Sequence, residues 1–147
     1  MSTRIRPETS KKNPYYISKH RQYELQHFVM QYPEWEEKLR EISGLVKVPC
    51  TDSDKVNQGS TSDITGDTAV LRQLYSRNID IVVAAAEQTH PIFGIQIVKN
   101  IICGVSYCDW SDGKYMSRDE YYKLYRKFYY ILDKLRDSHN IQPPLWQ

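Results

Sequence analysis

The sequence predicts an all-α protein, a compact helical domain of about five helices. Apolar residues recur at intervals of three and four, the spacing that places them on one face of a helix. No stretch alternates convincingly between polar and apolar residues, as a half-buried strand would. With 147 residues, 40% of them hydrophobic, the chain is long enough to bury a core, and we expect one domain.

Residues 15–44 predict a helical hairpin, preceded by a flexible basic arm at 1–14. Ser18 suits the N-cap of the first helix, because a serine hydroxyl accepts a hydrogen bond from an amide of the first turn. Pro33 suits the first position of a second, shorter helix, since proline has no amide proton to leave unpaired. Gly44 is expected to end that helix.

Residues 45–66 are rich in Ser, Thr, Asp and Gly and predict a polar loop or linker that divides the chain. A helical core is expected over 67–138, and a tail over 139–147. Asp67 or Thr68 would cap a long helix that contributes much of the core. The apolar residues that recur at helical intervals in it are Leu71, Leu74, Tyr75, Ile79, Val82, Val83 and Ala86.

Residues 91–138 predict a helix-turn-helix-like unit. A helix that ends at Gly104 would be followed by a short helix at about 105–110, then by a turn. Ser117 and Glu120 match a capping box, S-x-x-E, at the start of the last helix. The predicted turn is longer than in the tightest form of the motif.

The last helix has an apolar stripe and a face of cations and phenols. The stripe consists of Tyr121, Leu124, Tyr125, Phe128, Ile131, Leu132 and Leu135. The opposite face consists of Arg118, Tyr122, Lys123, Arg126, Lys127, Tyr130 and Lys134. The same pattern is also typical of a solvated helix whose cations only keep the protein soluble.

In a helix-turn-helix the second helix places its N-terminal residues in the DNA major groove. Arg118 and Tyr122 would then reach base edges. Lys123, Arg126 and Lys127 would lie over phosphates, where they add affinity but little sequence information. Additional contacts are expected from Lys11, Lys12, Lys19 and Arg21.

The charge is unevenly distributed along the chain, although the net charge is only +2. Residues 1–23 carry six cations and one anion, residues 24–112 carry seven and thirteen, and residues 113–147 carry seven and four. The three segments therefore have charges of +5, −6 and +3. Basic ends around an acidic middle suit a domain with one face for a polyanion.

Three stretches resemble small phage-encoded regulators: NPYYISKHRQYELQHFVMQYPEW, ITGDTAVLRQLYSRNID and YYKLYRKFYYILDKLRD. Together they span most of residues 13–137 and are similar to the RinA and ArpU groups of late-gene transcriptional activators. The resemblance implies a helical phage protein whose C-terminal helix-turn-helix, like the promoter-binding region of sigma factors, binds double-stranded DNA. It also implies host RNA polymerase as a further partner and the bacterial cytoplasm as the location.

A second hypothesis is a small phage inhibitor of a host protein, such as an anti-CRISPR protein that binds a defence nuclease. The acidic middle of the chain could face the basic nucleic-acid channel of such a nuclease. Mimicry of a whole DNA duplex is not expected, because a duplex mimic would carry a large negative net charge.

The sequence indicates neither an enzyme nor a metal or cofactor site. The cysteines at 50, 103 and 108 and the four histidines show no metal-ligand spacing, and no nucleophile is placed beside a base. No apolar run approaches the roughly 20 residues that span a membrane. A homodimer is expected, joined through the apolar stretch at 79–86 or the PPLWQ tail.

Overall fold

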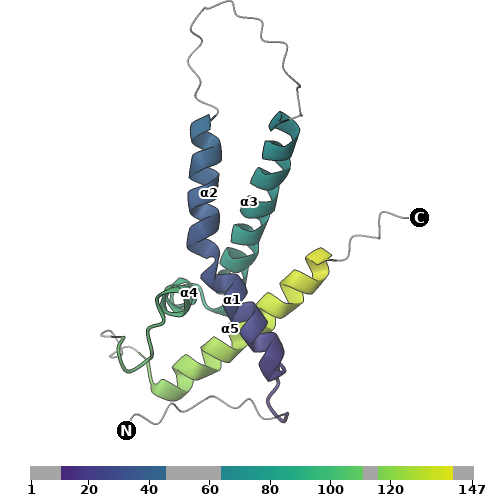
Figure 1. Ribbon diagram of the computed structural model, residues 1–147. Helices are drawn as coiled ribbons and strands as arrows, with labels where there is room; N and C mark the ends of the chain where they lie inside the picture. The colour runs from purple at the N-terminus through teal and green to yellow at the C-terminus, as the bar shows by residue number, and fades with distance from the viewer. Residues whose placement is uncertain (1–10, 46–63, 111–115, 141–147) are drawn as a thin grey trace, which may run out of the picture. The chain divides into compact units, whose positions relative to one another are not determined.

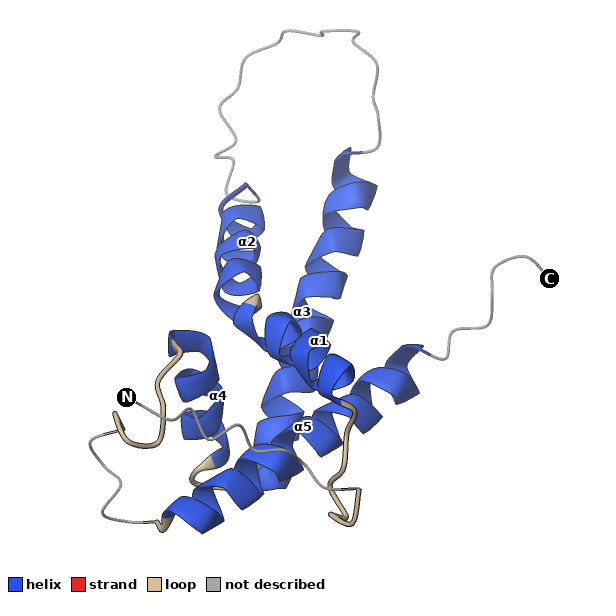
Figure 2. Ribbon diagram, turned by 60° about the horizontal axis from the view of Figure 1, so that its bottom comes forward, coloured by secondary structure: helices blue, strands red, loops and turns tan. Residues whose placement is uncertain are grey.

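The computed structural model describes residues 11–45, 64–110 and 116–140 (Figures 1 and 2). Every regular element in these ranges is an α-helix, which confirms the all-α class. The helices are α1 (Lys19–Met30), α2 (Tyr32–Leu45), α3 (Ile64–Thr89), α4 (Gly94–Cys103) and α5 (Arg118–Asn140). Most of the expected arm, the polar loop, the turn before α5 and the tail lie outside the described residues.

The chain divides into two compact units. The first unit consists of Met1–Gln31 and Ile81–Gln147, and so holds α1, α4, α5 and the C-terminal end of α3. The second unit consists of Tyr32–Asp80 and holds α2 and the rest of α3. Residues 46–63 of the polar segment that we expected to divide the chain, 45–66, lie outside the described residues.

Two of the predicted helix starts are confirmed at the level of their hydrogen bonds. Ser18 Oγ accepts a hydrogen bond from the Arg21 amide at 3.4 Å, as an N-cap does. At α5 the Ser117 amide donates to Glu120 Oε2 at 3.1 Å, and the Glu120 amide donates to Ser117 Oγ at 3.3 Å. This reciprocal pair is the capping box that the sequence predicts.

The helix α3 begins earlier than predicted. It starts at Ile64, so neither Asp67 nor Thr68 is its N-cap. Asp67 instead lies in the first turn, where a carboxylate is favourable because it faces the positive end of the helix dipole. An aspartate is favourable both at the N-cap and in the first turn of a helix. Its presence alone therefore does not identify the first helical residue.

The helix α4 begins later than predicted but ends where we expected. The amides of Ile92 and Phe93 both donate to His90 Nδ1 at 3.1 Å, within a turn that precedes the first helical residue, Gly94. Gly104 ends the helix in the left-handed conformation, with φ of 66°. A glycine adopts this conformation without the steric cost that other residues bear, so the predicted glycine stop is confirmed.

The short helix expected at about 105–110 is a turn. The amides of Asp109 and Trp110 both donate to Ser106 O at 3.1 Å, and the chain does not continue into a helix over the residues described there. A single turn gains too few hydrogen bonds to offset the cost of starting a helix. The helix-turn-helix-like unit is therefore not confirmed.

The first unit buries its core between α1, α4, α5 and the end of α3. Among its helices, α1 packs against α4 and α5, and α4 packs against α5. The most deeply buried apolar side chains are Leu25, Val29, Val82, Ala85, Ala86, Ile97, Phe128, Tyr129 and Leu132. Because Val82, Ala85 and Ala86 are core residues, much of the stretch at 79–86 is not a free surface for the expected homodimer.

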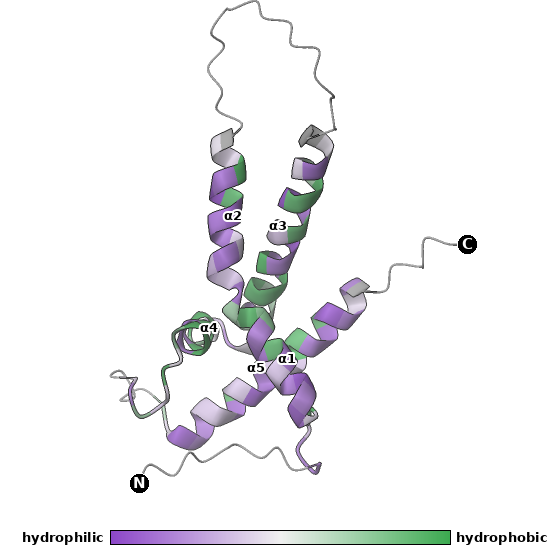
Figure 3. Ribbon diagram, viewed as in Figure 1, coloured by the Kyte–Doolittle hydropathy of each residue, from purple (hydrophilic) through white to green (hydrophobic). Residues whose placement is uncertain are grey.

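The second unit buries fewer apolar side chains than the sequence predicts. Trp35 and Ile42 of α2 are buried. Leu71 and Leu74 of α3, which we expected in the core, are 43% and 47% exposed, and Val70 is 66% exposed. Figure 3 shows apolar residues in green along α3. Helical spacing determines which residues share a face, but burial requires that another element covers that face.

A close approach of two helices in the first unit depends on Gly94. A Cβ atom placed on Gly94 would lie 1.9 Å from the carbonyl oxygen of Ala86 and 2.6 Å from its carbonyl carbon. Both contacts are with backbone atoms of α3, which cannot move aside as a flexible side chain can. The start of α4 therefore lies against the α3 backbone only because this residue has no side chain.

We predict that Gly94→Ala lowers the free energy of unfolding by about 1–3 kcal/mol or more, because overpacking forces the α3 and α4 backbones apart. Chemical denaturation measures the change. The matched control is Gly44→Ala in α2, where nothing lies within 4 Å of an added Cβ. That variant should change stability by less than about 1 kcal/mol. Equal effects of the two substitutions would contradict the close approach.

Candidate nucleic-acid interface

One face of α5 is anchored in the core by aromatic rings. Tyr121, Phe128, Tyr129 and Leu132 are each no more than 3% exposed. Three of these four belong to the predicted stripe. Tyr129 does not, and we missed it although it follows Tyr125 by four residues, a spacing at which helical side chains lie on neighbouring turns.

The phenol groups on this face have polar partners within the protein. Asn100 Nδ2 donates to Tyr121 Oη at 3.1 Å, and Gln96 Nε2 donates to Asn100 Oδ1 at 3.0 Å. Tyr125 and Tyr129 share a hydrogen bond at 3.4 Å between their hydroxyl groups. Burial raises the pKa of both tyrosines, and that of Tyr129 well above the ordinary value of 10.0, so both stay neutral at ordinary pH.

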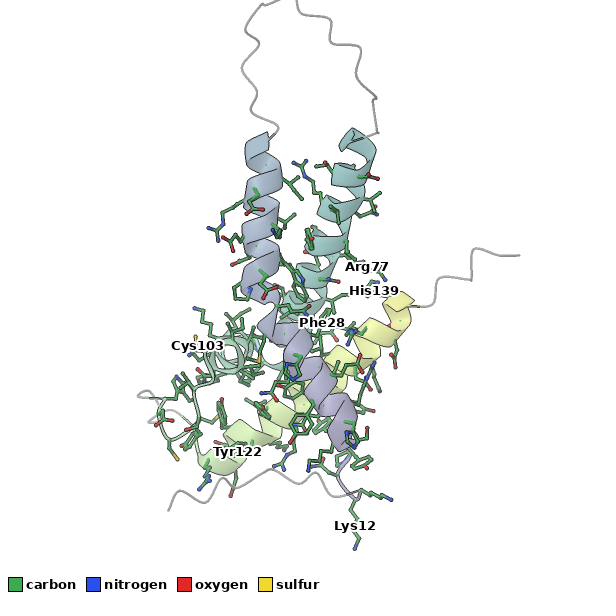
Figure 4. The ribbon with its side chains drawn as sticks, in the orientation of Figure 1. Lys12, Phe28, Arg77, Cys103, Tyr122 and His139 are labelled. Carbon is green, nitrogen blue, oxygen red and sulfur yellow. The ribbon has the colours of Figure 1, made fainter. Side chains whose placement is uncertain are left out.

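The predicted cations of α5 do not share one side of the helix. Arg118 and Lys127 are nine residues apart, which at 3.6 residues per turn places them on opposite sides. Arg118 and Lys123 are exposed, while Tyr122, Arg126 and Lys127 are half-buried. Figure 4 shows Tyr122 near the N-terminal end of α5. Among the described residues, no carboxylate lies within ion-pair distance of these four cations. Asp119 and Glu120 precede Lys123 by four and three residues, a spacing that permits ion pairs, but neither is paired with it.

Lys127 and Arg126 differ in their hydrogen bonds within the protein. Lys127 Nζ donates to the carbonyl oxygen of Thr89 at 3.1 Å, where it satisfies a carbonyl at the C-terminus of α3. Arg126 Nε is buried and has no hydrogen-bond partner among the described residues. Lys127 thus has a structural role, whereas Arg126 keeps a donor that no group of the described chain accepts.

A row of alternating cations and rings runs along α5. Its members are Arg118, Tyr122, Arg126, Tyr130 and Lys134, spaced four residues apart. Such a row is one of the natural ridges of a helix and is inclined to its axis by roughly 26°. Arg118 Cζ lies 5.8 Å from the ring centroid of Tyr122, and Lys134 Nζ lies 4.3 Å from that of Tyr130. We call these five residues the outer row.

Only Arg118, Tyr122 and Arg126 of the outer row are among the contact residues predicted from the sequence. Tyr130 and Lys134 were placed on the outer face of the helix but not among the contact residues. The interval of four residues was the signal that could have included them. The N-terminal segment also reaches the row, because the ring of Tyr15 packs edge-on against Tyr130 with centroids 5.6 Å apart.

Arg21, an expected additional contact, is occupied within the protein. Its Nε donates to Asp133 Oδ1 at 2.5 Å, its Nη2 to Asp137 Oδ1 at 2.8 Å and its Nη1 to Glu24 Oε2 at 2.9 Å. Arg136 Nη1 donates to the other oxygen of Glu24 at 3.1 Å. This network joins α1 to the C-terminal half of α5, so Arg21 is not a free cation for a ligand.

The remaining expected contacts lie near the start of the described chain. Lys11, Lys12 and Lys19 are all exposed. Lys12 extends away from the ribbon in Figure 4. They belong to the segment that holds Tyr15 and to the first residue of α1, and so they extend the basic character of the first unit.

The charge of the middle of α5 is purely positive. Between residues 121 and 132 the sequence has three cations and no acid. The acids of this helix lie near its ends: Asp119 and Glu120 in the first turn, and Asp133 and Asp137 in the network with Arg21. A polyanion that lies along the middle of α5 would meet cations and rings.

The described residues contain no group of three or more His, Cys, Asp or Glu side chains that could hold a metal ion. Cys103 and Cys108, the two cysteines described, are free and exposed. None of the helices in the described part of the chain is both long and apolar enough to cross a membrane.

No protein-family model, curated protein or solved structure matches the chain. The resemblance to the RinA and ArpU regulators therefore stays an expectation that rests on the quoted stretches of sequence.

The network around Arg21 predicts a loss of stability in acid. Arg21 donates to Glu24 and lowers the pKa of that carboxyl below the ordinary value of 4.5. A lowered pKa in the folded state means that the charged carboxylate stabilises the fold, fully at a pH above about 4.5 and less as the pH falls through the folded value. We expect Glu24→Gln to lower the melting temperature at neutral pH and to reduce its fall below pH 4.5.

The effect should be small, because the side chain of Glu24 is 52% exposed and water screens its ion pairs. Glu37→Gln is the control, since Glu37 is an exposed carboxylate with no ion pair among the described residues. Melting curves recorded over a pH series compare the two variants. A pH profile of Glu24→Gln that coincides with that of the wild type would contradict the role of the network.

Proposed function

We propose that this chain is a nucleic-acid-binding protein that holds the phosphate backbone against the outer side of α5. The observation that carries the proposal is that Arg118, Lys123 and Arg126 have no ion-paired carboxylate among the described residues. A solvated helix usually balances its cations with acids three or four residues away. Cations without such partners are free to exchange their counterions for phosphates.

The more specific form of the proposal is a phage-encoded DNA-binding regulator of transcription that acts in the bacterial host. It is supported by the resemblance to the RinA and ArpU groups and by the basic, tyrosine-rich last helix. The mode of binding differs from that of a helix-turn-helix. The segment at 105–110 is a turn, and the first turn of α5 exposes Asp119, which would repel phosphates at the mouth of a groove.

We predict that the double variant Arg118→Gln, Lys123→Gln binds a mixed-sequence DNA duplex about tenfold more weakly at low salt, because two phosphate contacts are lost. The slope of log affinity against log salt should fall by about two. Both side chains are exposed, so the fold should be retained. Fluorescence anisotropy of a labelled duplex at several salt concentrations measures both quantities.

The matched control is Arg72→Gln, which removes an exposed arginine of α3 in the second unit. It should leave both the affinity and the salt slope within about twofold of the wild type, because Arg72 lies outside the proposed face. If the double variant binds as the wild type does, α5 is not the face that holds the backbone. If the wild type binds no nucleic acid at low salt, the proposed function is wrong.

A second candidate function is the binding of a host protein, such as a defence nuclease inhibited by a phage protein. The observation that favours it is the exposed apolar surface of α3 in the second unit, formed by Val70, Leu71 and Leu74. Exposed acids lie on α2 of the same unit: Glu34, Glu36, Glu37 and Glu41. Apolar patches beside charged residues are typical of protein contacts.

For this candidate we predict that a pull-down from bacterial lysate returns a stoichiometric protein. The variant Leu71→Asp, Leu74→Asp should lose that protein, because charges replace the exposed apolar side chains while the buried Trp35 and Ile42 are untouched. The variant Arg118→Gln, Lys123→Gln is the control and should retain it. A wild-type pull-down without a stoichiometric protein would dismiss this candidate.

A further inference from the structure

The outer row carries more rings than a face for phosphates requires. Cations alone suffice to hold a phosphate backbone. Here each of the two rings, Tyr122 and Tyr130, stands between two cations of the row, and both rings are half-buried rather than sealed in the core. A face of this kind suits a ligand that has flat apolar groups as well as negative charge.

We propose that the outer row binds nucleic-acid strands with unpaired bases, and that Tyr122 and Tyr130 stack on those bases. This inference rests on the proposed function and specifies its ligand. In a duplex, the faces of the bases are covered by their neighbours, and a side chain meets only their edges or the backbone. In a single strand the faces are accessible, and proteins that bind such strands combine aromatic side chains with a positive groove.

The spacing of the row suits a strand that lies along the helix. Tyr122 and Tyr130 are eight residues apart, or about 12 Å along the helix axis. A strand that rises about 3.4 Å per nucleotide covers this distance in three to four nucleotides. Arg126 lies between the two rings in the row, where its fork of N–H donors suits the phosphates that join the stacked bases.

Both rings already pack edge-on against other tyrosines, Tyr122 against Tyr121 and Tyr125, and Tyr130 against Tyr15. An exposed cation also lies beside each of them. Lys134 Nζ lies over the ring of Tyr130, and Arg118 lies near the ring of Tyr122. Both cations are exposed, so each can leave its ring without exposing the core. A cation–π contact at an exposed site is weaker than a base stacked on an aromatic ring. A base would thus displace the cation, which would then be free to pair with a phosphate.

The residues at the N-terminus of α5 favour a single strand that lies along the side of the helix. They disfavour a duplex whose groove would hold the N-terminus of α5. Asp119 is exposed in the first turn, and Glu120 is held there by the capping box. Tyr15 extends the row sideways, because its ring contacts Tyr130. Both observations point to the middle of α5 as the place where a strand lies.

The first experiment compares ligands for the unaltered full chain. Labelled oligothymidylate, oligouridylate and a blunt mixed-sequence duplex with the same total number of nucleotides are titrated at one salt concentration. We expect the single strands to bind at least about tenfold more tightly than the duplex, because only they offer base faces to the rings. A preference for oligothymidylate or for oligouridylate identifies DNA or RNA as the source of the strand, and equal binding supports the chemistry that they share.

The second experiment removes the rings. Tyr122→Leu and Tyr130→Leu should each weaken binding of the preferred single strand by roughly five- to a hundredfold, the range found when a base–aromatic stack is lost. Tyr122→Phe and Tyr130→Phe keep the ring and should bind within about twofold of the wild type. Tyr23→Leu is the control, since Tyr23 is 43% exposed on α1 outside the row. Circular dichroism checks that each variant is helical.

Two results would overturn the inference while leaving the proposed function intact: equal, salt-sensitive binding of duplex and single strands, or leucine variants that bind single strands as the wild type does. The comparison of ligands needs no variant, so the inference can fail even if a leucine variant does not fold. Absence of binding to all three ligands at low salt would overturn the inference and the proposed function together.

Discussion

The aromatic face that α5 buries against α1 and α4 determines what its other side can do. Phe128, Tyr129 and Leu132 are almost fully buried, and Asn100 satisfies the hydroxyl group of Tyr121. With these side chains pointing inward, Arg118 and Lys134 of the outer row are exposed, whereas Arg126 is half-buried and its Nε is buried.

The rotation of α5 about its axis is fixed near both ends. Near the N-terminus, the hydrogen bond from Asn100 to Tyr121 joins α5 to α4. Near the C-terminus, Arg21 of α1 pairs with Asp133 and Asp137. This network also occupies the acids of the C-terminal half of α5, so they do not neutralise the cations in its middle. The close packing of α4 on α3 at Gly94 positions the surface on which α5 rests.

Local signals in the sequence predicted much of the fold. The cap at Ser18, the capping box of α5 and the glycine stop of α4 depend on a few neighbouring residues and were all confirmed. The features that the sequence did not predict depend on residues that are distant in the chain. The exposure of Leu74 and the pairing of Arg21 with acids more than a hundred residues away are not encoded in helical spacing. The sequence placed Tyr130 on the outer face of α5, but its contact with Tyr15, more than a hundred residues away, is visible only in the structure.

The most direct test of nucleic-acid binding by the outer side of α5 is photo-cross-linking. The full chain would be irradiated with an oligothymidylate that carries 5-bromodeoxyuridine, and the modified residues would be identified by mass spectrometry. Adducts are expected on Tyr122 and Tyr130, the rings of the outer row. Adducts confined to the second unit, at residues 32–80, would contradict it, because the ligand would then bind a part of the chain with no residue of that row.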